Sequence, residues 1–316
     1  MFSLGFLGIF CLLVFAVGLA FSVWVLWVVW VVVRSEVMLR WLRVLRSYAE
    51  GCPVEPELRG WSWQYPPVRP RAFLGLSVYD VAPYCPTRRD VWLRRVSGVR
   101  VQPSQAMRLG LEVHEVISSV VGAVRRYLHS PGDAPRVYRV VERLVSSRAS
   151  TCGSRDCAGL VEGVGWLTYH TLVSEWLWSY SSSYLAPAML SLSEVRVDGT
   201  PLGLSSGLRV DAIPLSNVVV DVKVGRRSEN HEIAVAAYAM ALEASLEVPV
   251  DYGLLVYIGW NGAVSVDVRG VYVGPDLRRA FIDSRDETID MLLASREPPK
   301  ATDCPSSCPY LEVCGK

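Results

Sequence analysis

Two aspartates and a lysine lie close together in the sequence, in a pattern suited to chemistry on a phosphodiester. The triplet Asp221-Val222-Lys223 follows Asp211 by ten residues. Two carboxylates and an amine on one face of a sheet can hold a divalent metal ion and act on a phosphate. Lys223 is one of only three lysines in the 316 residues, whereas arginine serves elsewhere. A lysine kept at this position indicates a use for its compact amine, although a structural ion pair with Asp221 is the other reading.

The surrounding residues predict that these side chains lie on a hairpin. Two apolar segments, residues 206–214 and 218–224, read as strands joined by a polar turn at 216–217. Side chains alternate along a strand, so Asp221 and Lys223 point to the same face. The hairpin can then bring the first aspartate beside them.

A histidine upstream is a candidate metal ligand. His114 lies with Gly110 on a strongly predicted helix, residues 106–128. Such a histidine is ordinarily a core or boundary residue, but the small glycine permits close packing and the carboxylates downstream favour ligation. Asp211 lies in an apolar strand, where a buried carboxylate is costly without a partner. Glu194 could stand near the site as a carboxylate outside the ligand set, but a position on the surface is the reading that the sequence favours.

The remaining hydrophobic patterns predict an α/β protein with a mixed sheet flanked by helices. Several helices precede the first strand, which indicates a helical insertion before the sheet. The tail, residues 298–316, has no regular pattern. We expect helices at 36–49, 77–84, 91–96, 106–128, 136–147, 167–180, 231–247 and 275–295, and strands at 190–197, 250–259 and 263–273 besides the hairpin.

The net charge of the protein gives no indication of a nucleic-acid partner. The formal net charge is +1, and 51% of the residues are apolar. The arginines nevertheless cluster locally. They could form salt bridges on a solvated surface, or a stripe along a cleft that binds phosphates. The clusters are Arg69/Arg71, Arg88/Arg89, Arg94/Arg95/Arg100, Arg125/Arg126, Arg226/Arg227 and Arg278/Arg279.

The N-terminal segment, residues 2–33, contains no charged residue and is long enough to cross a bilayer. Arginines follow it, which by the positive-inside tendency places the rest of the chain in the cytoplasm. The segment makes a poor secretory signal, because it lacks a charged start and a small-residue cleavage site. Alternatively, translation begins at Met38 and not at Met1, and the protein is cytoplasmic without an anchor. Both readings stay open.

Three cysteines in the tail suggest a metal or cluster site. Cys304, Cys308 and Cys314 lie in a segment with too few apolar residues to fold by packing alone, and Cys85 is the best candidate for a fourth ligand. Four thiolates suit zinc or an iron–sulfur cluster. The C-x3-C-x5-C spacing differs from paired C-x2-C zinc sites and favours the cluster. Disulfides are the alternative, which a cytoplasmic location disfavours.

The other cysteines do not suggest a second metal site. Cys152 and Cys157, with four residues between them, predict a local disulfide or no pairing. Cys52 has no assignable role.

Together these features resemble the CRISPR-associated RecB-like nucleases that carry an iron–sulfur cluster, the "Cas-four" group, and in particular its archaeal Apern-type (subtype I-A) branch. The resemblance covers residues 38–316, and the combination of motifs is more specific than any one of them. The residues that carry it are Arg59-Gly60-Trp61, the segments 84–90 and 110–114, Asp211, Asp221-Val222-Lys223, the stretch 232–243 with Tyr238, the segment 285–287 and the terminal cysteines.

The resemblance implies a fold and a reaction. The fold would be the restriction-endonuclease-like PD-(D/E)xK core, with residues 106–297 as the nuclease core and its helical insertion. Residues 1–37 would be the hydrophobic segment, 38–105 an N-terminal helical and arm region, and 298–316 the cluster-bound tail. The activity would be metal-dependent cleavage of DNA, as an exonuclease on single strands or duplex ends, which trims or selects spacer precursors for the CRISPR integrase and other adaptation proteins.

The resemblance also implies the site residues. Mg²⁺ or Mn²⁺ would be bound by His114, Asp211, Asp221 and the carbonyl of Val222, with Lys223 as the catalytic lysine. A 4Fe-4S cluster would be bound by the four cysteines at positions 85, 304, 308 and 314.

One departure supports a second reading. The family pattern has glutamine four residues before the helix tyrosine, Tyr238, and this sequence has Ala234 there. Tyr238 itself could be near the site or simply in the core. The alternative function is therefore a non-catalytic iron–sulfur subunit that binds the integrase or DNA ends. A third reading is a generic nuclease anchored to a membrane by residues 2–33.

Overall fold

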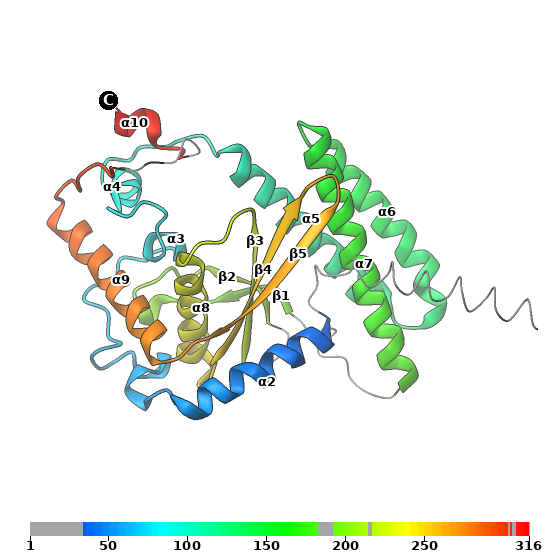
Figure 1. Cartoon of the computed structure of the whole chain (residues 1–316), viewed down its shortest axis with the longest axis horizontal. Coiled ribbons are helices and arrows are strands. Elements are labelled where there is room, and N and C mark those ends of the chain that lie inside the picture. The colour runs from blue at the N-terminus through cyan, green and yellow to red at the C-terminus, as the bar shows by residue number, and fades with distance from the viewer. Residues whose placement is uncertain (1–33, 183–191, 214–216, 303, 305–307, 316) are drawn as a thin grey trace, which may run out of the picture.

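A five-stranded mixed sheet lies at the centre of the protein (Figure 1). The computed structural model describes residues 34–182, 192–213, 217–302, 304 and 308–315. The strand order is β1-β2-β3-β4-β5, in which β3 and β4 are parallel and the other neighbours are antiparallel. The strands are β1 Leu192–Val197, β2 Leu208–Ile213, β3 Val218–Val224, β4 Tyr252–Trp260 and β5 Val264–Tyr272.

The predicted hairpin is confirmed, because β2 and β3 pair as antiparallel neighbours. The parallel step from β3 to β4 is made through helix α8, Asn230–Leu246, which starts and ends within one residue of the prediction. Helix α8 is apolar on all sides, as expected of a helix buried between a sheet and another helix. Helix α9, Pro275–Ala294, packs on its outer side and begins with the predicted proline.

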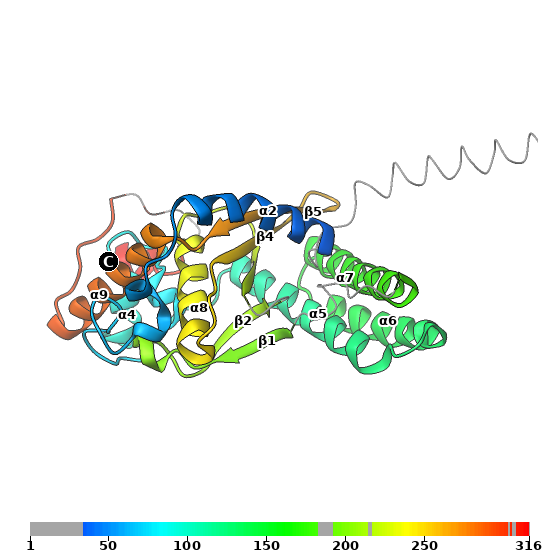
Figure 2. The same cartoon turned by 90° about the horizontal axis from the view of Figure 1, so that it is seen from below.

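Two hydrophobic cores lie on opposite faces of the sheet. Val219 and Leu255 face the core that includes α8 and α9, whereas Val218 and Val220 face the second core. Figure 2 shows α8 and α9 on one side of the sheet and the helical insertion on the other. The insertion consists of α5 Gln105–Tyr127, η3 Pro131–Asp133, α6 Ala134–Ser150 and α7 Arg155–Ser182.

Helix α7 is longer than predicted. It begins at Arg155, whereas the sequence pattern placed its start at residue 167. The glycines in its first half misled the prediction, since glycine usually weakens a helix. Here they allow close packing: a Cβ at Gly159 would lie 2.7 Å from the Trp260 side chain, and one at Gly165 would lie 2.6 Å from Val145.

Helix α2, Ser35–Gly51, is the first helix of the described residues and crosses the sheet at β5, where Gly270 accommodates the ring of Trp41. The prediction for residues 2–33 lies outside the described residues. Within the part of the chain that is described, no helix is both long and apolar enough to span a membrane.

Short helices occupy the arm and the tail. The arm contains η1 Pro56–Leu58, η2 Gly60–Ser62, α3 Val78–Val81 and α4 Arg89–Arg95, and η5 Thr200–Leu202 follows β1. The tail was predicted to be irregular, but it ends in α10, Leu311–Gly315, which carries Cys314. Leu311 and Val313 of this helix are exposed. The sequence therefore shows no buried apolar face from which a helix could be predicted.

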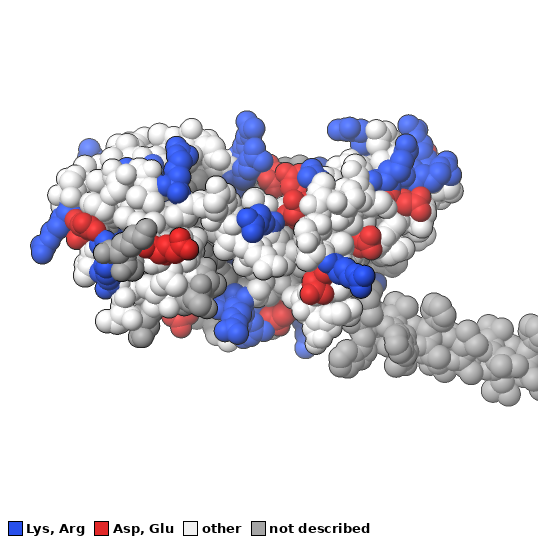
Figure 3. Space-filling model, turned by 90° about the horizontal axis from the view of Figure 1, so that it is seen from above, with Lys and Arg blue, Asp and Glu red and all other residues white. Residues whose placement is uncertain are grey.

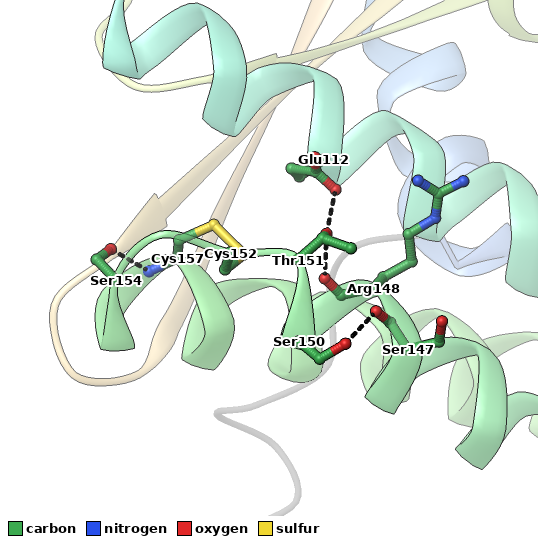
Figure 4. Close-up of a disulfide and its surroundings, with 8 residues drawn as sticks. All are labelled: Glu112, Ser147, Arg148, Ser150, Thr151, Cys152, Ser154 and Cys157. Atoms are coloured by element: carbon green, nitrogen blue, oxygen red, sulfur yellow. Dashed lines mark hydrogen bonds between the residues drawn. A yellow bond between two sulfur atoms is a disulfide. The ribbon is translucent and has the colours of Figure 1, made fainter.

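A disulfide joins Cys152 and Cys157 at the corner between α6 and α7 (Figure 4), which agrees with the local pairing considered above. Thr151 beside it donates a hydrogen bond to the Arg148 carbonyl, 2.7 Å away, and reaches Glu112 on α5 at 3.5 Å. The bridge therefore fastens the corner of the insertion, at a distance in the chain from the other cysteines.

Candidate metal and catalytic site

The helical insertion brings a histidine to the sheet. His114 on α5 lies with Nδ1 3.3 Å from Oδ1 of Asp211 on β2. Burial alone favours the neutral imidazole, but the hydrogen bond and the negative charge of Asp211 outweigh it and raise the pKa of His114. The same contact holds the pKa of the Asp211 carboxyl below its ordinary value despite burial. An imidazole and a carboxylate thus face each other over β2, an inner strand of the sheet.

The Asp211 side chain accepts a hydrogen bond from the β3 backbone where a carbonyl of the neighbouring strand would ordinarily do so. The described register between the two strands consists of Ala212 opposite Val220. Beyond that pair the Val222 amide donates to Oδ2 of Asp211, at 2.6 Å, instead of to a backbone carbonyl. The carboxylate is therefore fixed on both oxygens, one by the imidazole and one by the β3 backbone.

Asp221 and Lys223 form a buried pair on the same face of β3, as their spacing predicted. Lys223 Nζ donates to Oδ1 of Asp221 at 2.7 Å, and the Asp221 side chain is 4% exposed. Burial, together with the charge of Asp211, raises the pKa of Asp221 to about 6 against the opposing effect of Lys223. Burial would lower the pKa of Lys223, but the Asp221 charge outweighs it and raises that pKa. The other carboxylate oxygen, Oδ2, is buried with no hydrogen-bond partner among the described residues.

Sequence reasoning left Glu194 undecided, and the structure brings it to the site. One atom from each of His114, Glu194 and Asp211 lies within 4.8 Å of the other two. Asp221 does not belong to this group, so the predicted ligands divide into two neighbouring sets. Glu194 falls opposite Asp211 in the register of β1 and β2, and this register could not be derived from the sequence.

Aromatic side chains line the α8 side of the site. Burial, and then the charges of Asp221 and Asp211, raise the pKa of Tyr238, so this tyrosine lies near the carboxylates as well as against the core. His231 at the start of α8 lies between the hydroxyls of Tyr84, 3.2 Å away, and Tyr257, 3.1 Å away. Burial and the positive charge of Lys223 lower the pKa of His231 to about 4.

The four cysteines of the predicted cluster converge from separate segments. Cys85 lies before α4, and Cys304, Cys308 and Cys314 lie in the tail; all four are free and half-buried. Burial raises the pKa of Cys308, and the other three thiols raise it further. These electrostatic effects mean that the four thiols lie in the same region of the protein.

Two arginines hold these segments together through direct contacts. Arg89 donates to the Pro298 carbonyl at 2.6 Å and pairs with Glu297, just before the tail. Arg88 bonds to Ser284 and Thr288 of α9, both at 3.0 Å. The residues after Cys85 are thereby attached to the chain that leads into the tail.

Other arginine pairs differ in role. Arg94 and Arg95 both bond to the buried Asp80, which is a structural use. Exposed arginines, in contrast, gather where α5 and α6 meet, and Figure 3 shows a group of basic side chains at the end of the molecule formed by this bundle. The exposed arginines of these two helices include Arg125, Arg126, Arg136 and Arg139.

The fold and the site define a class: a mixed α/β protein in which a histidine and acidic side chains meet over a sheet beside a lysine, with a separate group of cysteines. The family model described as "CRISPR-associated exonuclease Csa1" matches residues 32–316. The chain therefore belongs to that family, which confirms the resemblance to the Cas-four group of CRISPR nucleases.

Two relatives carry the same description. The protein of Thermoproteus tenax is 35% identical over 301 residues, which cover 88% of this chain and 96% of the relative. The protein of Saccharolobus solfataricus is 30% identical over 281 residues, which cover 83% of this chain and 92% of the relative.

Proposed function

We propose that this protein is a metal-dependent DNA exonuclease that acts on single-stranded or duplex ends in CRISPR adaptation. The relatives are named as CRISPR-associated exonucleases. The observation that carries the proposal is the meeting of His114 and Asp211 beside the buried Asp221–Lys223 pair. By the same resemblance, its partners are the CRISPR integrase and the other adaptation proteins, and its core is the PD-(D/E)xK fold.

The donor set suits Mg²⁺ or Mn²⁺. Carboxylate and carbonyl oxygens are the ligands that these cations prefer, and Mn²⁺ also accepts an imidazole. Asp221 Oδ2, a buried acceptor without a partner among the described residues, is the kind of atom that a cation would satisfy. His114, Asp211, Asp221 and the Val222 carbonyl would hold the ion. When bound, it supplies Lewis acidity, which makes water a better nucleophile and stabilises negative charge on the phosphate.

The protein's own groups position the reaction. Asp211 is held in one orientation by the Val222 amide and by His114, so its carboxylate needs little reorganisation. Lys223 donates to Asp221 and is kept protonated by it, which suits orientation of the attacking water and stabilisation of charge on the phosphate better than proton abstraction.

We propose a 4Fe-4S cluster at the four cysteines. They come from distant segments, lie in one region of the protein and form no disulfide with one another, which supports this assignment. The cluster would join the tail to the segment before α4 and so close the chain around the core. Its role here is structural, since hydrolysis transfers no electrons. Protein purified without oxygen should contain about four irons per chain, and Cys304→Ala should lose them while Cys52→Ala does not.

The nuclease proposal is tested by cleavage of end-labelled single- and double-stranded DNA with Mg²⁺ or Mn²⁺. Asp211→Ala and Lys223→Ala should each abolish cleavage, the first because it removes an oxygen ligand and the second because it removes the ammonium. Lys300→Ala and Asp267→Ala, which change exposed residues elsewhere, should retain activity. Lys223→Ala should leave Mn²⁺ binding largely intact, because an ammonium is not a ligand.

The non-catalytic alternative rests on Ala234 in place of the family's glutamine. Ala234 is buried in the core on the α8 side of the sheet, one helical turn before Tyr238. The contacts of His114 with Asp211 and of Asp221 with Lys223 do not involve it. If the wild-type protein, with its cluster and its adaptation partners present, cleaves no DNA with either metal, the binding-subunit reading replaces the nuclease.

A further inference from the structure

Glu194 has an unusual backbone conformation at the site. In the register of β1 and β2, Ser193 lies opposite Ala212 and Val195 lies opposite Val210, so Glu194 falls opposite Asp211. That position is skipped in the pairing, and Glu194 has φ of 52°, in the left-handed region. A residue other than glycine adopts this conformation at a cost of about 1–3 kcal/mol, and such residues concentrate at functional sites.

The interrupted pairing accompanies a carboxylate that reaches the histidine. Glu194, His114 and Asp211 each offer one ligand atom within 4.8 Å of the others, and all three side chains are half-buried. Two carboxylates this close repel each other unless a cation or a proton lies between them. Beside them, the buried Oδ2 of Asp221 adds an acceptor without a partner among the described residues.

A structural ion pair is the competing explanation for Glu194. Its Oε2 lies 3.6 Å from a guanidinium nitrogen of Arg209, whose side chain is 60% exposed. An ion pair as long and exposed as this contributes little to stability. It does not account for a left-handed residue that directs a carboxylate toward an imidazole and a second carboxylate.

We propose that Glu194 is a direct ligand of the catalytic cation, together with His114 and Asp211. This inference rests on the proposed function, in which the site binds Mg²⁺ or Mn²⁺. It adds a β1 carboxylate to the ligands that the family resemblance implies. The cation then lies where α5, β1, β2 and β3 meet, with Asp221 of β3 among its ligands and Lys223 beside it.

The test is a Mn²⁺ titration of the full chain with its cluster intact, in which free Mn²⁺ is followed by electron paramagnetic resonance. Glu194→Gln keeps the size of the side chain and removes its charge, and it should weaken Mn²⁺ binding at least tenfold. Arg209→Ala removes the competing ion pair and should not weaken it. Glu142→Gln, on the exposed side of α6, is the matched control. Circular dichroism and thermal melting establish that each variant is folded.

The outcomes separate this inference from the proposed function. If Asp211→Asn loses Mn²⁺ while Glu194→Gln binds it like the wild type, the site is real and Glu194 is not a ligand. Equal weakening by Glu194→Gln and Arg209→Ala would show a structural ion pair and would also overturn the inference. If the wild type itself binds no Mn²⁺ at millimolar concentration, the proposed function fails first.

Discussion

Replacing Glu243 by glutamine should destabilise the whole nuclease fold, because its carboxylate is the centre of a buried ionic network. It accepts two hydrogen bonds from Arg278, at 2.6 and 2.9 Å, and one from Arg59 at 2.8 Å. It also accepts the backbone amides of Gly60 and Val250, at 2.8 and 3.0 Å. The carboxylate and the Arg278 guanidinium are both fully buried.

The structure sets the expected size of the effect. Glutamine keeps one acceptor oxygen but places an NH₂ group against N–H donors, and it leaves Arg278 buried without its full counter-charge. Breaking one partner of a buried ion pair costs about 3–5 kcal/mol. The network around Glu243 connects α8, α9 and the Arg59-Gly60-Trp61 motif. The substitution should therefore lower the free energy of global unfolding. Glu55→Gln, which removes an exposed partner of Arg279, should cost less than about 1 kcal/mol.

The effect should also depend on pH in a defined direction. Burial would raise the pKa of Glu243, but the hydrogen bonds and charge of Arg278 outweigh it and lower that pKa. A carboxyl whose pKa is lower in the folded state stabilises the protein above its unfolded pKa, about 4.3. This contribution is lost as the pH falls through the lower, folded value. The stability difference between wild type and Glu243→Gln should therefore be full at pH 7 and should shrink below about pH 4.

The measurement is urea unfolding followed by tryptophan fluorescence, under anaerobic conditions, from pH 7 to the lowest pH at which both proteins fold. A difference below about 1 kcal/mol at pH 7 would refute the reasoning. So would a large difference that stays constant in acid, since it would come from packing and not from charge.

Three further changes test separate parts of the fold. Gly60→Ala should cost about 3 kcal/mol or more in the same unfolding assay, because its Cβ would lie 1.9 Å from the Met240 carbonyl oxygen on α8; stability equal to wild type would contradict this close approach. Arg89→Ala should speed the loss of iron from the proposed cluster to a chelator, followed by absorbance, because it frees the chain that leads into the tail; an unchanged rate would mean that the cysteines alone hold the tail. Cys152→Ser should lower stability by up to about 2 kcal/mol, the loop-closure entropy of its short bridge to Cys157, and should leave the iron content unchanged.

The hairpin and the placement of its charged side chains could be predicted from the sequence because their determinants are local. Alternation of side chains fixes Asp221 and Lys223 on one face whatever the rest of the chain does. The two segments are close together in the sequence, which favours pairing of β2 with β3 and brings Asp211 near them. The apolar sequence of α8 likewise suffices to predict a buried helix.

Features that depend on long-range packing could not be predicted in this way. The first half of α7 is rich in glycine, a signal for a loop, and its helical state depends on Trp260 and Val264 filling the space beside those glycines. The hydrogen bond from Arg89 to the Pro298 carbonyl joins residues 209 positions apart in the chain. Composition and periodicity contain no information on contacts of this range.

Glu194 shows most directly where local reasoning ends. From the sequence, it is an acidic residue in a strand next to Arg196, consistent with a solvated face. Its importance depends on two facts that the sequence does not contain: the register that sets it opposite Asp211, and the left-handed backbone that interrupts the pairing there. An ordinary strand conformation would have kept the ladder and cost less. We infer that the conformation is retained because a carboxylate is needed beside His114, which is the claim that the Mn²⁺ titration addresses.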